Sequence, residues 1–281
     1  MANIVGYIGT SHVPAIGKAV AQKLQQEPYW KPFFDSFPPL RAWLARLKPD
    51  VIVAFYNDHG LNFFLDQMPT FAVGAAPTYS NADEGWGLPN FGTFRGHPEL
   101  SWHIIRQLVD DEFDPVSCQE MLVDHAFSIP MALLYPDTQD FPVRVVPICL
   151  NTVQLPMPSP KRCLALGHSV GRAIRSWHED LNVVVMGTGG LSHQLDGERA
   201  GFINKPFDLM SLDALVNDPQ ALARLTTLDL VEKAGAQGVE LVNWLAARGA
   251  IAAAVHEVQR SYHIPISNTA AAVLALEPAS G

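Results

Sequence analysis

Cysteine is scarce in this sequence, and its placement excludes a disulfide-stabilised scaffold. The three residues are Cys118, Cys149 and Cys163, an odd number with no CxxC pair and no zinc-ribbon spacing. Disulfide-rich proteins belong to oxidising compartments, so we expect free thiols here and a reducing, cytoplasmic environment.

Long hydrophobic runs are also missing. No apolar stretch approaches the roughly 20 residues that cross a bilayer. The N-terminus, MANIVGYIGTSH, has no basic region ahead of an apolar stretch and no signal-peptidase site. We therefore expect an intracellular protein without a membrane partner.

The sequence has fewer basic than acidic residues. The formal net charge is −9 and the pI is about 5.5, which leaves no broad basic surface for nucleic acid. A local anion site remains compatible with this balance, so an acidic substrate is not excluded. Hydrophobic residues make up 48% and charged residues 17%, which predicts a substantial core.

Strand and helix patterns alternate along the chain. Apolar runs typical of buried strands cover 4–8, 51–56, 143–150 and 181–186. Helical spacing of apolar residues is found around 40–47, 100–108 and 163–177. This alternation predicts an α/β fold, with residues 1–281 forming a single domain around a central, mainly parallel sheet flanked by helices.

The segments between these elements are less regular. Residues 57–97 are rich in Gly, Pro and Asn, and we interpret them as a long functional excursion over the end of the sheet. Residues 151–160 are Pro-rich and resemble a covering loop. From Pro219 onward we expect helices, the last of them in SNTAAAVLALEP, where Ser267, Asn268 or Thr269 would cap an anion-binding N-terminus or act only as an ordinary cap.

Three histidines stand at equivalent places, each just after a predicted strand. His12 follows IVGYIGTS, His59 follows VIVAFYND and His193 follows VVVMGTGGLS. The carboxyl ends of parallel strands share one edge of a sheet, where ligands bind in α/β folds. The alternatives are a shared site at this edge and three unrelated residues in solvent-exposed loops.

Glu240 is a candidate partner for these histidines. It opens an apolar helical segment, AGAQGVELVNWLAARGA, and a buried carboxylate there would need a cation or a proton. The simpler interpretation is a solvated first-turn Glu favoured by the helix dipole. If the carboxylate is buried, His12, His59 and Glu240 match the two-His-one-carboxylate triad of non-haem Fe(II) oxygenases.

Separated motifs along the whole chain carry a resemblance to one family. They are, in order, TSHVPAIG, YNDH, ADEGWG, GHPEL, VDHA, GTGGLSHQL, GERAGFIN and YHIPISNTA. The chain resembles the class III extradiol ring-cleavage dioxygenases, and within them the protocatechuate 4,5-dioxygenase β subunits and gallate dioxygenases.

The resemblance implies a role for each candidate residue. Fe(II) would be held by His12, His59 and Glu240, with His193 as the acid–base residue and His125 as a second histidine facing the substrate. Ser267 and Asn268 match residues that hold the ring carboxylate. We also assign Val13, next to His12, to the substrate-binding residues.

The expected activity is therefore cleavage of a carboxylated catechol, protocatechuate or gallate, by O₂ to a hydroxymuconate semialdehyde-type product. The alternatives are a Memo-like binding protein without catalysis and a zinc hydrolase that uses the same ligands. Because the sequence ends soon after SNTAAAVLALEP, the resemblance implies a separate small α subunit in a heterotetramer, or else a homodimer.

Overall fold

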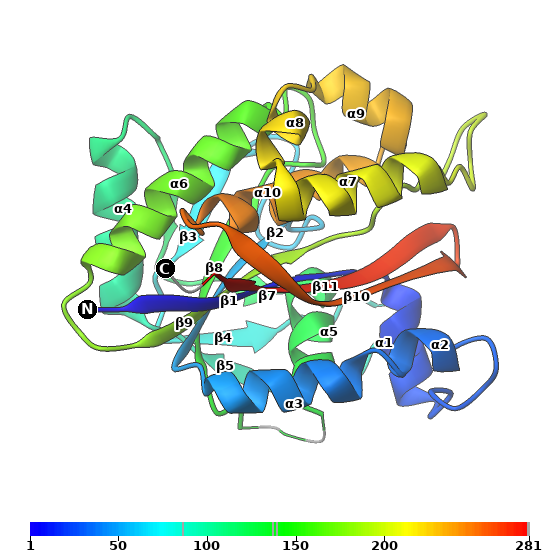
Figure 1. The fold of residues 1–281 in the computed structure, drawn as a ribbon, viewed down its shortest axis with the longest axis horizontal. Helices are drawn as coiled ribbons and strands as arrows, with labels where there is room; N and C mark the ends of the chain where they lie inside the picture. Colours follow the sequence, from blue (N-terminus) through cyan, green and yellow to red (C-terminus); the bar gives the residue numbers. More distant parts are fainter. Residues whose placement is uncertain (86, 137, 139, 280–281) are drawn as a thin grey trace.

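A twisted 8-stranded sheet runs through the middle of the molecule (Figure 1). The computed structural model describes residues 1–85, 87–136, 138 and 140–279. The strand order is β10-β11-β1-β9-β2-β8-β3-β6. The strands are β1 (Asn3–Thr10), β2 (Val51–Tyr56), β3 (Phe71–Gly74), β6 (Val116–Cys118), β8 (Arg144–Leu150), β9 (Asn182–Thr188), β10 (Val255–Ile266) and β11 (Thr269–Pro278). A smaller 3-stranded sheet, ordered β5-β4-β7, contains β4 (Thr78–Asn81), β5 (Thr93–Arg95) and β7 (Leu122–Val123).

The centre of the large sheet is parallel. Strands β1, β9, β2 and β8 run in the same direction, whereas β11 pairs with β1 and β3 pairs with β8 in antiparallel fashion. Every residue of β2 is buried, which explains its unbroken apolar sequence, because a central parallel strand is covered on both faces. The mainly parallel α/β fold that the sequence predicted is confirmed.

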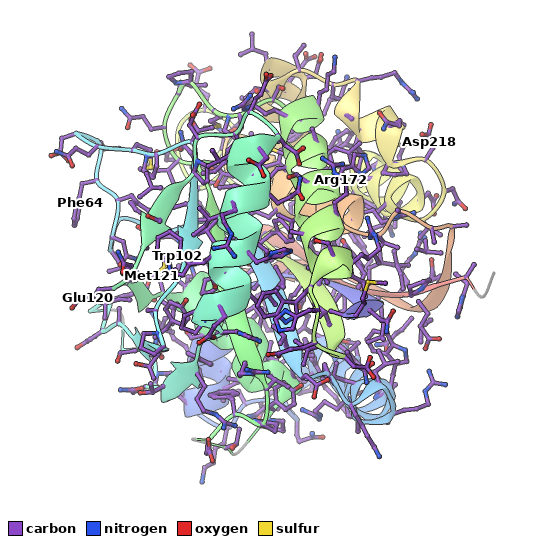
Figure 2. All side chains as sticks on the ribbon, turned by 90° about the vertical axis from the view of Figure 1, so that its left-hand side faces the viewer. Phe64, Trp102, Glu120, Met121, Arg172 and Asp218 are labelled. Carbon is purple, nitrogen blue, oxygen red and sulfur yellow. The ribbon has the colours of Figure 1, made fainter. Side chains whose placement is uncertain are left out.

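Helices cover both faces of the sheet and enclose two apolar cores. In Figure 1, α4, α6, α7 and α10 lie above the sheet and α1, α3 and α5 below it. Figure 2 shows α4 and α6 side by side on the end of the molecule that is at the left of Figure 1. The helices are α1 (Pro14–Ala21), α2 (Lys31–Phe34), α3 (Phe37–Leu47), α4 (Pro98–Asp110), α5 (His125–Leu134), α6 (Pro160–Ser176), α7 (Lys205–Asn217), α8 (Pro219–Ala223), α9 (Thr227–Ala234), the 3₁₀ helix η1 (Gly238–Glu240) and α10 (Leu241–Gly249).

The four predicted strands and three predicted helices are confirmed to within a few residues. Across the described residues, none of the helices combines the length and apolar character that crossing a membrane requires.

Two predictions were wrong. Residues 57–97 are not one irregular excursion, because they contain β3, β4 and β5. The expected C-terminal helix is instead strand β11, the second arm of a hairpin with β10. Alanine favours helices, yet the run from Thr269 to Leu276 is fully buried between β10 and β1, and burial in a sheet outweighs that weak preference.

Candidate functional site

The three strand-end histidines meet at one edge of the sheet. Strands β1 and β2 both pair with β9, so the segments that follow them leave the sheet side by side. The imidazole rings of His12 and His59 lie 5.4 Å apart, edge to face. His193 lines the same cleft as both of them. The interpretation of three unrelated exposed loop residues is wrong: His12 and His193 are buried, and His59 is partly buried.

Glu240 is the carboxylate of this cluster. Glu240 is the last residue of η1, directly before α10, and it is only 5% exposed. The interpretation of Glu240 as a solvated first-turn residue is therefore wrong. Its carboxylate oxygens lie 3.4 Å from His12 Nε2 and 3.6 Å from His59 Nε2. His193 Nε2 is slightly farther away, at 3.9 Å.

Neutral hydrogen-bond donors fix the Glu240 carboxylate. The backbone N–H of Gly190 donates to Oε2 at 2.7 Å, and Asn57 Nδ2 donates to Oε1 at 3.2 Å. Asn243 in turn donates to Asn57 Oδ1 at 3.0 Å and so orients that amide. Burial acts to raise the pKa of Glu240, but the neighbouring imidazoles outweigh it and hold the pKa well below its usual range. The group is therefore an anion.

The far nitrogens of both rings are also held. His12 Nδ1 lies 3.1 Å from Thr188 Oγ1, and His59 Nδ1 lies 2.9 Å from Asp124 Oδ2. Such contacts fix the ring and direct Nε2 towards a shared point, as they do for metal-binding histidines in general. The sequence interpretation gave no role to Thr188 or Asp124.

Asp124 serves two purposes. Its carboxylate caps α5 by accepting the Ala126 N–H at 3.0 Å, and it accepts both the backbone and the ring N–H of His59. Burial opposes ionisation of Asp124, yet the charge of His59 lowers its pKa to about 2. An Asp directly before an apolar helix is a recognisable cap signal, so this residue was within reach of sequence reasoning.

The cluster stabilises positive charge. Burial acts to lower the pKa of His59, but Asp124 and Glu240 outweigh it and raise that pKa to about 10. A proton on His59 thus lies between two carboxylates, at a place where a divalent cation would satisfy the same negative charge. The donor set, two imidazoles and a carboxylate, suits a metal of the non-haem iron or zinc type.

His125 is placed beside these residues by another carboxylate. Its ring lies 4.2 Å from that of His59, and its Nδ1 is 2.7 Å from Glu84 Oε1. Burial and the charge of His59 lower the pKa of His125. Glu84 belongs to the ADEGWG motif, and its contact with His125 brings this motif to the site. Trp86 of that motif lies outside the described residues.

Two other groups of residues could also hold a metal ion. Ligand atoms of His12, His59 and His125 lie within 4.8 Å of one another, as do those of Glu84, Asp124 and His125. However, Glu84 and Asp124 already accept hydrogen bonds from histidine rings and backbone N–H groups. Glu240 has no such tie to Nδ1 of a histidine and faces the Nε2 atoms. It therefore completes the site with His12 and His59 better than the other carboxylates.

His193 directs Nε2 to the cleft, 3.9 Å from a carboxylate oxygen of Glu240. Its Nδ1 donates to the Leu191 carbonyl at 3.0 Å, so Nε2 is the ring nitrogen that remains for a ligand. The close approach requires Gly190, because a Cβ at that position would lie 2.5 Å from His193 Cε1. Gly190 therefore allows the ring of His193 to pack closely against the backbone of the segment that follows β9.

The cluster opens into a cleft of about 970 Å³. Val13 and Ser267 line it, as do Thr152, Val153, Gln154 and Leu155 of the predicted covering loop. Asn268 is not among the lining residues and lies near Gly201. Ser267 and Asn268 occupy the turn between β10 and β11, and Ser267 adopts a φ of 56°. The predicted helix N-terminus for an anion is therefore wrong.

Comparisons with known proteins agree with this geometry. A family described as the catalytic LigB subunit of aromatic ring-opening dioxygenase matches residues 6–273. Gallate dioxygenase of Pseudomonas putida is 42% identical over 196 residues, 70% of this chain and 57% of that protein. A 2,3-dihydroxyphenylpropionate/2,3-dihydroxicinnamic acid 1,2-dioxygenase of Photorhabdus laumondii is 32% identical, over 67% of this chain and 56% of the relative. The match thus spans little more than half the length of these relatives.

A solved structure extends the likeness of the fold. The crystal structure of an uncharacterized protein from Escherichia coli K12 superposes with a TM-score of 0.59 at 13% identity. It covers 96% of this chain and 99% of the other. With the family match over residues 6–273, the strand-end histidines and the buried Glu240, the chain belongs to the family of catalytic subunits of aromatic ring-opening dioxygenases.

Proposed function

We propose that this chain is a non-haem Fe(II) extradiol dioxygenase that cleaves the ring of a carboxylated catechol, protocatechuate or gallate, with O₂. The product would be of the hydroxymuconate semialdehyde type. One observation carries the proposal: the Nε2 atoms of His12 and His59 approach the buried Glu240 carboxylate at 3.4 and 3.6 Å, beneath an open cleft.

His12, His59 and Glu240 would hold the metal. Three protein ligands would leave part of the metal accessible to the substrate diol and to O₂. Fe(II) bound there would supply Lewis-acid and redox chemistry for the reaction of the diol with O₂. The remaining steps depend on the side chains around it.

His193 is the proposed acid–base residue. Its Nδ1 is held by the Leu191 carbonyl, so Nε2 is the atom that can accept a proton from a substrate hydroxyl and later return it. An imidazole suits this exchange because its ordinary pKa lies near neutral pH. His125, fixed by Glu84 and next to His59, would contact the substrate as well.

The substrate carboxylate would be held farther out. Ser267 lines the cleft and is fixed at the hairpin turn, where its N–H donates to Tyr29 Oη at 3.1 Å. We keep Asn268 and Val13 as substrate-binding candidates, Asn268 as the neighbour of Ser267 and Val13 as a lining residue beside His12. A neutral hydroxyl and amide would recognise a carboxylate by hydrogen bonds.

A partner chain would cover the mouth of the cleft. Its lining includes large apolar side chains that are mostly exposed, namely Leu65 (68%), Leu155 (64%), Leu195 (56%) and Leu228 (72%). Contiguous exposed apolar groups around a site are typical of interaction surfaces. We propose a small α subunit in a heterotetramer, with a second copy of this chain as the alternative. A cytoplasmic location is supported by the three free cysteines.

The experiment is O₂ uptake by chain that is reconstituted anaerobically with Fe(II) and offered protocatechuate, gallate or catechol. We expect uptake with a carboxylated substrate, ring-cleavage absorbance, and little reaction with catechol. Zinc-reconstituted chain should consume no O₂, and any hydrolase activity specific to zinc would favour the zinc-enzyme alternative. If no O₂ is consumed with any of the three substrates, also after addition of an α subunit, the proposal is contradicted.

A further inference from the structure

Lys18, in the second turn of α1, is the one lysine or arginine among the described residues that line the cleft. The other lining residues are histidines, Glu240, and neutral polar and apolar residues. Pro14 and Ala15 line the cleft as well, and residues three and four positions apart share one face of a helix. Lys18 thus extends the cleft-facing side of α1, which starts two residues after the metal-binding candidate His12.

Lys18 lacks a counter-charge in the part of the chain that the structure describes. There, no carboxylate forms an ion pair with it, whereas Lys31 on the next helix pairs with Asp35 at 2.6 Å. Among the described lining residues, Glu240 is the one acidic group, and it already contacts imidazoles and hydrogen-bond donors. An anion that entered the cleft would therefore find Lys18 without competition.

The surroundings strengthen such a pairing. The chain carries 28 acidic and 19 basic residues, so its overall charge is negative. An unpaired lysine side chain in the cleft is a local positive charge that would attract an anion there. Val13, Val153, Leu155 and Met157 line the same cleft, and apolar walls reduce the screening of a charge pair.

We infer that Lys18 is a specificity-determining residue that pairs with an anionic ring substituent on the side of the substrate remote from the diol. This inference rests on the proposed function, because it takes the diol to lie at the His12, His59 and Glu240 end. Ser267 contributes hydrogen bonds to the same carboxylate, and Lys18 contributes the charge. The ligand class is a catechol with a carboxylate, in preference to a neutral catechol.

The test is anaerobic equilibrium binding of protocatechuate and of catechol to Fe(II)-loaded chain, by titration calorimetry, with O₂ uptake measured in parallel. Because Lys18 is exposed, Lys18→Met should weaken protocatechuate binding by up to about fivefold, the loss of one exposed ion pair, and leave catechol binding unchanged. Lys18→Arg should stay close to the unaltered chain. Lys161→Met, the same substitution at an exposed position of α6, should change the affinity for neither ligand.

The outcomes separate the two proposals. If Lys18→Met binds protocatechuate as tightly as the unaltered chain, or loses both ligands equally, the role of Lys18 is overturned. If binding depends on Lys18 but no O₂ is consumed, the binding role stands and the proposed function fails. If the unaltered chain binds neither ligand, also after addition of an α subunit, both fail. Salt should weaken protocatechuate binding in the unaltered chain and hardly affect it in Lys18→Met.

Discussion

The inner and outer halves of the cleft are built in opposite ways. In the inner half, the polar side chains are held by other groups of the protein: His12 by Thr188, His59 by Asp124, and Glu240 by the Gly190 backbone N–H and Asn57. In the outer half, apolar side chains such as Leu155 and Leu228 are largely exposed, and Lys18 has no ion-pair partner among the described residues.

This contrast indicates that the inner half of the cleft carries out the reaction and that the outer half recognises the substrate or partner. A reacting centre needs ligands held in one geometry before the substrate arrives, and mutual hydrogen bonds supply this preorganisation. A recognition surface instead needs groups that remain unsatisfied until a ligand or partner covers them. Substitutions in the inner half should therefore change metal binding and turnover, and those in the outer half should change affinity for substrate or partner.

The largest effect is expected at Glu240. Glu240→Ala removes the carboxylate that faces both imidazoles, so Fe(II) affinity should fall by more than about 100-fold, beyond the loss typical of a supporting residue, and turnover should vanish. Metal content after dialysis measures this. Glu198→Ala, at an exposed position, is the control. Normal iron content in Glu240→Ala would remove this residue from the metal site.

Loss of His193 should separate the two inner functions. His193→Ala takes away the proton acceptor but no proposed ligand, so we expect iron content to be retained and kcat to fall about 10²- to 10⁴-fold. Iron analysis and O₂ uptake on the same sample test this. Full activity would exclude His193 from catalysis, and loss of the metal would make it a ligand.

Metal affinity should rise with pH. Without metal, the carboxylates raise the pKa of His59 to about 10, so near neutral pH this ring is protonated and the metal must displace that proton. Affinity should then increase about tenfold per pH unit between pH 6 and 8, measured by competition with a chelator of known pH response.

Asp124→Asn sharpens the same prediction. Because it removes a charge that raises the pKa of His59, the pH dependence should flatten within this range. An affinity that is independent of pH in the unaltered chain would contradict the charge distribution described for the inner half.

The smallest effect is expected at the cleft mouth. Leu228 is 72% exposed on α9, and Leu230, two residues later, is 2% exposed. Leu228→Ala should change the free energy of unfolding by less than about 0.5 kcal/mol, whereas Leu230→Ala should cost about 2–5 kcal/mol. Denaturant unfolding measures both. A large loss at Leu228 would show that the exposed apolar groups support the fold and are not reserved for a partner.

Sequence reasoning was most successful where local pattern and tertiary position coincide. Strand β2 is apolar because it is buried on both faces, and a histidine after it must lie at the sheet edge. The same logic gave His12 and His193. The family resemblance supplied the choice of Glu240 as a ligand over a solvated residue. Its burial excludes the solvated interpretation, and its role as a ligand stays a prediction.

The errors and omissions have a common physical cause. The Ala-rich segment after Ser267 satisfies helix and strand patterns alike, and only its neighbours β1 and β10 decide between them. Glu84 and Thr188 were missed because each contacts a histidine that is distant in the sequence. Local sequence patterns do not predict such contacts.

The proposed metal site is tested most directly by a crystal structure of the chain grown anaerobically with Fe(II), with anomalous data collected at the iron edge. We expect one iron peak bonded to Nε2 of His12, Nε2 of His59 and the Glu240 carboxylate, with its open side towards the cleft. An iron held by His125, or one placed among Glu84, Asp124 and His125, would contradict the proposed metal site.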